Sequence, residues 1–171
     1  MELSIYEQAF SRYFNTINFP KTPLATWDFY SSHFSDLKKS ISDTVLLKNF
    51  EIKNKWNCDW NMQEELQDQT VIVLTDVNLK IVFASKNMVS MNGYLPSEVI
   101  GQHPKMFQGE ATNSNVSKII GEAVKNRVPF QEVVINYCKD GSLYKCEIKG
   151  YPIFDSSGKL RNFIAFEKMV A

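Results

Sequence analysis

The residues with the widest choice of chemistry lie in one short loop, GQHPKMFQG, at positions 101–109. His103 brings an imidazole and Lys105 a fixed positive charge, and both types are common where a protein holds a ligand. Pro104 stands between them and carries no nucleophile. The loop follows an apolar helical run, so we expect it to contact a ligand without performing catalysis.

The three cysteines, Cys58, Cys138 and Cys146, do not form a recognisable set. Their odd number and the lack of a CxxC spacing indicate neither a disulfide framework nor a zinc site. Cys138 and Cys146 could form a redox switch, but buried structural thiols are the favoured interpretation. No nucleophile, base and orienting residue occur together, and no glycine-rich phosphate loop is present. We therefore expect no catalytic residues and no metal site.

The composition excludes several classes of protein. Hydrophobic residues make up 44% and charged residues 22% of the 171 residues, as in a soluble globular protein. Lys plus Arg and Asp plus Glu both number 19, so neither nucleic acid nor an anionic membrane is an expected partner. The start, MELSIYEQAF, lacks the pattern of a signal peptide, and no apolar run could span a membrane. We expect a cytoplasmic protein.

Residues 1–60 read as helical. One apolar stripe is predicted within residues 2–17, and a second helix from about Trp27 to Leu47, after Pro20 and Pro23 have broken the pattern. The stretch EIKNKWNCDW fits neither helix nor strand clearly. Its two tryptophans suggest packing against something larger.

From residue 61 the pattern becomes rich in strands. A short helix is predicted over 62–69, then two strands, three helices and three more strands. The predicted strands are 70–76, 79–85, 130–138, 143–154 and 160–169, and the three later helices are 86–94, 95–101 and 113–127. This order predicts an α+β fold, with a five-stranded antiparallel sheet and short helices on one face.

The second part of the chain resembles a PAS domain and, more narrowly, the flavin-binding LOV subgroup. The resemblance covers about residues 70–168 and rests on six segments in the right order. They are LTD at 74–76, VFAS at 82–85, MNGYLPSEVIG at 91–101, FQG at 107–109, NYCKDG at 136–141 and FIAFE at 163–167. We therefore predict a PAS domain over 61–171, preceded by a helical N-terminal extension over 1–60 for capping or dimerisation.

The resemblance also shows what the loop has lost. LOV photoreceptors carry Asn-Cys-Arg there, and the cysteine forms a light-driven adduct with the flavin. This chain has His103, Pro104 and Lys105 instead, so adduct chemistry is excluded at that position. A histidine binds haem in some PAS sensors, but a lone loop histidine beside a proline is more often exposed.

By the same resemblance, five positions are candidates for cofactor binding. Gln108 and Asn136 match polar residues that hydrogen-bond the flavin, whereas Cys146 and Glu167 replace a ring-binding asparagine and the signalling glutamine. Lys105 keeps one of two phosphate-binding charges, and Gly121 has lost the other. We expect no cofactor, with flavin mononucleotide (FMN) as the alternative. Gln108 and Asn136 could equally satisfy neighbouring backbone. Glu167 could be a buried carboxylate with a raised pKa, or it could lie at the frayed end of the last strand.

Strand alternation supplies an independent prediction. If Asn136 faces the ligand side, then so do Val134, Tyr144, Cys146 and Ile148, and on the last strand Phe163, Ala165 and Glu167. The opposite face carries a set of apolar residues that water should not meet: Val133, Ile135, Tyr137, Ile164 and Phe166. We expect this interface to be covered by the N-terminal helices or by a second subunit.

Together these features predict a non-catalytic PAS-type sensory or regulatory module of the bacterial regulator type. It would act in signal transduction by ligand-dependent or constitutive protein interaction. The expected partners are a second copy in a homodimer, a signalling protein in trans and a small-molecule ligand. The sequence ends at KMVA, where the last predicted strand ends, so we expect the signal to leave through the helices, the dimer or the partner. One alternative is an adduct-free LOV-like photo- or redox sensor. Another is a structural dimerisation module whose pocket is filled by Met106 and Phe107. The identity of the ligand and the partner, and the dimer geometry, stay open.

Overall fold

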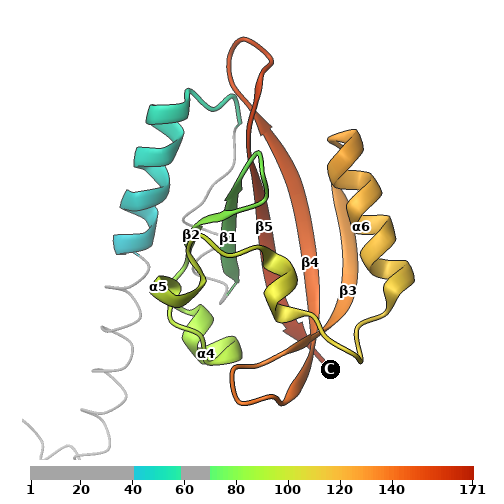
Figure 1. The fold of residues 1–171 in the computed structure, drawn as a ribbon. Coiled ribbons are helices and arrows are strands. Elements are labelled where there is room, and N and C mark those ends of the chain that lie inside the picture. Colours follow the sequence, from blue (N-terminus) through green and yellow to red (C-terminus); the bar gives the residue numbers. More distant parts are fainter. Residues whose placement is uncertain (1–40, 59–69) are drawn as a thin grey trace, which may run out of the picture. The chain divides into compact units, whose positions relative to one another are not determined.

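The sheet has five antiparallel strands in the order β2-β1-β5-β4-β3. This computed structural model describes residues 41–58 and 70–171 (Figure 1). The strands are β1 (Val71–Asp76), β2 (Ile81–Ala84), β3 (Phe130–Tyr137), β4 (Leu143–Phe154) and β5 (Leu160–Val170). The last strand of the chain, β5, lies at the centre of the sheet, where it pairs with β1 on one side and with β4 on the other. The predicted α+β fold is confirmed.

Four short helical elements connect β2 to β3. They are α4 (Met88–Asn92), α5 (Pro96–Val99), the 3-10 helix η1 (Pro104–Phe107) and α6 (Ser114–Asn126). Local signals set their ends. Gly93 ends α4 in the left-handed conformation that favours glycine, and Pro96 begins α5. The side chain of Asn113 accepts the Asn115 N–H at 2.9 Å and so caps the start of α6.

These connecting elements pack on one face of the sheet, which we call the inner face. Its core consists of Val71, Val73, Ile81, Ala84, Met88, Val99 and Phe107. On β4, Gly150 lies under the ring of Phe130, so close that a Cβ at residue 150 would lie 2.2 Å from that ring. The aromatic ring takes the space that a side chain at position 150 would need.

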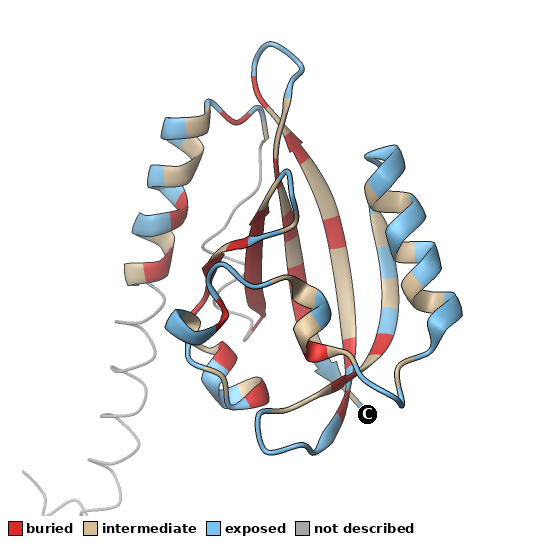
Figure 2. Cartoon of the chain, viewed as in Figure 1, coloured by how far each residue is buried: buried red, intermediate tan, exposed pale blue. Residues whose placement is uncertain are grey.

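A helix of residues 41–54 covers the opposite, outer face. Leu47 and Trp56 join a core cluster with residues of β1, β2, β4 and β5, and Phe50 packs against it. In Figure 2 the buried positions of this helix face the sheet. The helix predicted over 27–47 therefore ends later than expected, because it extends to residue 54, into the first four residues of the stretch that fitted neither helix nor strand. The outer-face residues Ile164 and Phe166 are buried in this cluster, as the alternation predicted.

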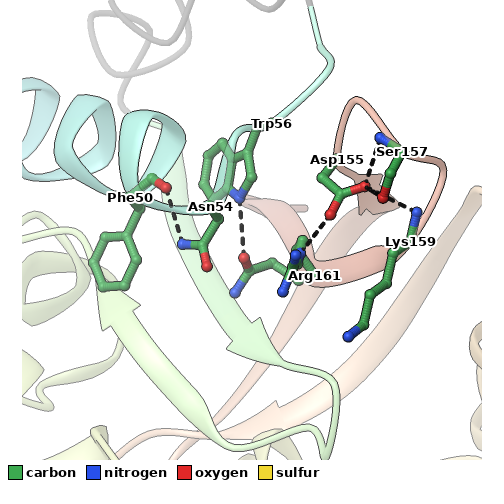
Figure 3. A network of polar contacts seen from close by, with 8 residues as sticks. Phe50, Asn54, Trp56, Asp155, Ser157, Lys159 and Arg161 are labelled. Carbon is green, nitrogen blue, oxygen red and sulfur yellow. Dashed lines mark hydrogen bonds and ion pairs between the residues drawn. The ribbon is translucent and has the colours of Figure 1, made fainter.

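The end of this helix is tied to the turn between β4 and β5. The indole Nε1–H of Trp56 donates to the Asn162 side chain at 3.0 Å, and the Asn57 N–H donates to the Phe154 carbonyl at 2.9 Å. Arg161 and the backbone of Ser157 bind the Asp155 carboxylate in that turn (Figure 3). These contacts fix the helix onto the sheet by polar as well as apolar interactions.

Other predictions fall on residues 1–40 and 59–69. The helix within 2–17, the first part of the helix over 27–47 and the helix over 62–69 lie outside the described residues. Among the helices that the structure describes, none is long and apolar enough to cross a membrane.

Candidate functional site

Five polar or titratable side chains gather on the inner face, and we call them the polar cluster: Asn92, Asn136, Tyr144, Cys146 and Glu167. All five are buried. Strand register explains why distant residues meet, since Asn136 pairs with Tyr144 across β3 and β4, and Val134 pairs with Cys146. Asn92 comes from the last position of α4. The site is therefore built by β3, β4, β5 and one short helix.

One atom of the polar cluster lacks a partner. The side-chain oxygen of Asn136, a residue only 3% exposed, accepts no hydrogen bond from any described residue. Its neighbour Tyr144 is better satisfied, because the Asn92 amide donates to the Tyr144 hydroxyl at 3.3 Å. Burial raises the pKa of Tyr144, which keeps the phenol neutral. A buried acceptor without a donor is costly, and it is the natural place for a ligand donor.

Glu167 is the second unusual group. Its described side-chain contact is the Cys146 thiol, whose Sγ lies 3.8 Å from Oε2. Burial raises the pKa of Glu167 to about 7, and the thiol contact only partly offsets this. Glu167 pairs with Val71 on one side and Ile148 on the other, in the middle of the sheet. Of the two predicted alternatives, the buried carboxylate is therefore correct and the frayed strand end is wrong.

Cys146 is held as a neutral thiol. Burial first, and then the nearby Glu167 carboxylate, raise the pKa of Cys146. No disulfide joins any of the three cysteines. No three metal-binding side chains meet in residues 41–58 and 70–171.

The 101–109 loop lies apart from these contacts. Lys105 is exposed, and its backbone N–H donates to His103 Nδ1 at 3.1 Å, which caps η1. His103 is half-buried, and burial followed by the charges of Lys105 and Lys80 lowers the pKa of His103. Gln108 accepts from the Ser117 hydroxyl at 3.3 Å. Within the described part of the chain, no hydrogen bond joins Lys105 or Gln108 to the polar cluster.

The apolar residues of the loop fill part of the inner core. Phe107 is 2% exposed and packs edge-to-face on Tyr94, with ring centroids 5.5 Å apart, and Met106 packs against the same cluster. Gly121, at the second phosphate position, is exposed on α6 with no atom near a would-be Cβ.

After Gln108 the chain is fastened to the edge strand β3. A Cβ on Gly109 would lie 2.6 Å from the Tyr137 ring. The Ala111 N–H donates to the hydroxyl of the same tyrosine at 2.9 Å. Thr112 Oγ1 donates to the Ile135 carbonyl at 2.6 Å. Tyr137 was predicted among the outer interface residues. Its ring instead contacts this loop, because β3 is an edge strand and the loop passes over its free side.

The other predicted interface positions separate into two groups. Ile164 and Phe166 are buried under the helix of residues 41–54, whereas Val133 is 47% exposed and Ile135 half-buried on β3. The helix covers the β1, β2 and β5 side of the outer face and leaves part of β3 open.

Two important residues escaped the sequence analysis. Asn92 looked like an ordinary helix-ending residue, and its contact lies 52 positions away at Tyr144. Asp43 was hidden in an apolar helix pattern, yet it is 2% exposed and accepts the Lys86 N–H at 2.7 Å. Burial is the main cause that raises the pKa of Asp43. Neither residue had a local signal in the sequence, because each bonds a residue far away along the chain.

Comparison with known proteins agrees with this architecture. The chain is 39% identical over 88 residues to Protein TWIN LOV 1 of Arabidopsis thaliana, which is 51% of this chain and 22% of that protein. It is 31% identical over 118 residues to Phototropin-2 of Oryza sativa subsp. japonica, covering 64% of this chain and 13% of that protein. The match thus spans less than a quarter of either relative.

A solved light-oxygen-voltage domain, determined in work on a flavin analogue, superposes with a TM-score of 0.61 and 26% identity, covering 66% of this chain and 87% of that one. Residues 68–168 match the PAS domain family itself. The sheet order, the helical connections and this match lead to one conclusion: the chain belongs to the PAS domain family.

Proposed function

We propose that this protein is a non-catalytic sensory module of signal transduction, in which the polar cluster responds to a small molecule and the outer-face helix transmits the response. The observation that carries the proposal is the buried, unpaired oxygen of Asn136 next to Tyr144. A ligand with an N–H or O–H donor would satisfy it, and Glu167 would supply a second acceptor or, when protonated, a donor.

The route from the polar cluster to the helix would run through α4. Asn92 at the end of α4 bonds Tyr144, and Lys86 just before α4 bonds the helix on the other face. That second link has two parts, since the Lys86 N–H donates to Asp43 and its ammonium donates to the Ser42 hydroxyl at 2.7 Å. A ligand that displaced Asn92 would shift this short helix and strain the Asp43 link. The response requires that the ligand bind the two arrangements with different affinity.

A flavin fits these residues poorly. The ring would meet a buried thiol at Cys146 and a carboxyl at Glu167, where amides would offer both donors and acceptors. Gly121 offers nothing to a phosphate, and Lys105 lacks a bidentate fork. We therefore propose a ligand without a flavin ring. An adduct-free flavoprotein is the competing assignment, supported by similarity to LOV proteins and by the Asn136 acceptor.

An absorbance spectrum of freshly purified protein, followed by denaturation and mass spectrometry of the released small molecules, tests the proposal. We expect no flavin band and a small molecule that the Asn136→Leu variant fails to retain. Released flavin would assign the competing function. A wild-type extract identical to that of the variant would favour a module filled by its own side chains, such as Phe107.

The open part of β3 supports a proposal about partners. We propose that a second copy or a signalling partner covers Val133 and Ile135, since the exposed Val133 and the half-buried Ile135 leave apolar side chains of β3 uncovered on the outer face. A Val133→Glu variant should shift the sedimentation equilibrium toward monomer without loss of fold. An unchanged oligomeric state would show that this surface carries no self-association.

A further inference from the structure

A pocket lies away from the polar cluster, between the β1–β2 turn, the end of α6 and the start of β5. Its volume is about 410 Å³, within the range of small-molecule sites. Its apolar wall consists of Val77, Leu79, Val124, Leu160 and Phe163. In Figure 1 the β1–β2 turn and the C-terminal end of α6 stand at the same end of the sheet.

Three positive charges border this apolar wall: Lys125 and Arg127 at the end of α6, and Lys159 before β5. All three are exposed. None of them makes an ion pair or a side-chain hydrogen bond with a described residue. Lys159 contacts Asp155 through its backbone N–H, while its ammonium extends away (Figure 3). No carboxylate lines the pocket.

The backbone at two lining residues is also unusual. Leu79 has φ 60° and Arg127 has φ 58°, a left-handed conformation that glycine adopts without steric cost. Both positions nonetheless carry long side chains that line the pocket. Leu79 supplies apolar surface and Arg127 supplies positive charge, and the pocket lining combines these two properties.

The pocket and the polar cluster occupy different ends of β5. Phe163 lines the pocket and Glu167 belongs to the cluster, four residues and about 13 Å along an extended strand. Between them, at the level of Ala165 and Gly150, lies the ring of Phe130. A molecule in the pocket would therefore not need to contact the unpaired oxygen of Asn136.

We propose that this pocket binds a small amphipathic anion, with an apolar body against Leu79, Leu160 and Phe163 and a carboxylate at the three cations. The apolar wall provides affinity through burial of hydrocarbon, and the charges select the sign of the head group. The site is independent of the function proposed for the polar cluster.

Titration of the ¹⁵N-labelled full chain with sodium octanoate, followed by amide chemical shifts, tests the proposal. We expect saturable shifts confined to Val77–Leu79, Lys125–Arg127 and Leu160–Phe163. Acetate lacks the apolar body and 1-octanol lacks the charge, so both should bind at least about tenfold more weakly. Raising the ionic strength should weaken octanoate binding, since the cations are exposed.

Two variants and one control sharpen the test. A triple variant, K125Q/R127Q/K159Q, should weaken octanoate binding about tenfold or more, whereas K48Q/K53Q/K118Q changes the net charge equally at exposed lysines outside the pocket and should have less than about a twofold effect. Leu79→Gly removes apolar wall while relaxing the backbone, so it should weaken binding without lowering thermal stability. Absence of saturable shifts, equal binding of octanol, or shifts centred on Asn136 and Glu167 would each overturn the proposal.

Discussion

The two faces of the sheet differ in how the buried polar side chains are hydrogen-bonded. On the outer face, Trp56 bonds Asn162, and Asn162 in turn donates to the Thr75 carbonyl at 2.9 Å, inside an apolar cluster closed by a helix. On the inner face, Asn136 keeps an unpaired oxygen and Glu167 a buried carboxyl. The two buried amides therefore differ, because the side chain of Asn162 is bonded through both its oxygen and its nitrogen whereas the oxygen of Asn136 has no donor among the described residues.

The largest effect should come from breaking the outer face. Trp56→Ala removes a buried ring and leaves the Asn162 oxygen without its donor, so we expect the free energy of unfolding to fall by about 3–5 kcal/mol in urea titrations. Ile52→Ala on the same helix is a matched control, because Ile52 is 74% exposed and its loss should stay within about 0.5 kcal/mol. Equal effects of the two substitutions would mean that the helix does not seal this face.

The next effect concerns pH and the inner face. The pKa of Glu167 rises from 4.5 when unfolded to about 7 when folded, so the folded state holds the proton more tightly. Stability from this group is full below pH 4.5 and is lost as pH rises through 7. Relative to Glu167→Gln, the wild type should lose roughly 2–3 kcal/mol between pH 5 and pH 8 in urea titrations. Parallel pH profiles of the two proteins would contradict a buried, titrating carboxyl.

A third prediction concerns the edge where the two faces meet. Gly109→Ala places a methyl group against the Tyr137 ring, and the ring must move away from the Ala111 N–H. We expect a loss of about 1–3 kcal/mol in thermal or urea unfolding. Gly121→Ala, on open helix surface, should instead add up to about 1 kcal/mol. A tolerated Gly109→Ala would show that the loop is not held against β3.

The smallest expected effect compares the same substitution, Asn to Leu, on the two faces. It should change the free energy of unfolding in opposite directions. Asn136→Leu removes an acceptor without a donor together with the contact of the same side chain with Tyr144, and because the loss of the unpaired oxygen should outweigh the loss of that contact, the free energy of unfolding should rise by about 1 kcal/mol. Asn162→Leu removes bonds to Trp56 and the Thr75 carbonyl and should lower it. Urea titrations at one pH suffice. Destabilisation by both substitutions would remove the distinction between the faces.

Much of the fold could be predicted because local patterns were consistent with it. Alternation placed the five strands and assigned Asn136, Cys146 and Glu167 to one face, and Gly93 marked the end of α4. The helix of residues 41–54 was harder. Its buried side includes Asp43, while Ile41 and Val45 are 62% and 55% exposed, so apolar periodicity did not report the packed face.

The site could be predicted only in part. Resemblance and alternation brought Asn136, Cys146 and Glu167 together, but Asn92 depends on a contact with Tyr144 across 52 residues, which no local pattern contains. The protonation state of Glu167 depends on how deeply the carboxyl is buried, and burial is a property of the folded chain. Lys105 and Gln108 were grouped with the site by the resemblance, and in the structure the Lys105 backbone N–H bonds His103 and the Gln108 side chain accepts from Ser117.

The contacts of Trp56 and Leu47 have a practical consequence for recombinant work. The family match begins at residue 68, and a gene fragment cut there would delete both side chains. The side chains of Ile72, Leu74 and Ile164 would then form a solvent-exposed apolar patch. Such a fragment should form inclusion bodies. A fragment cut before residue 41 instead keeps the helix that covers these side chains.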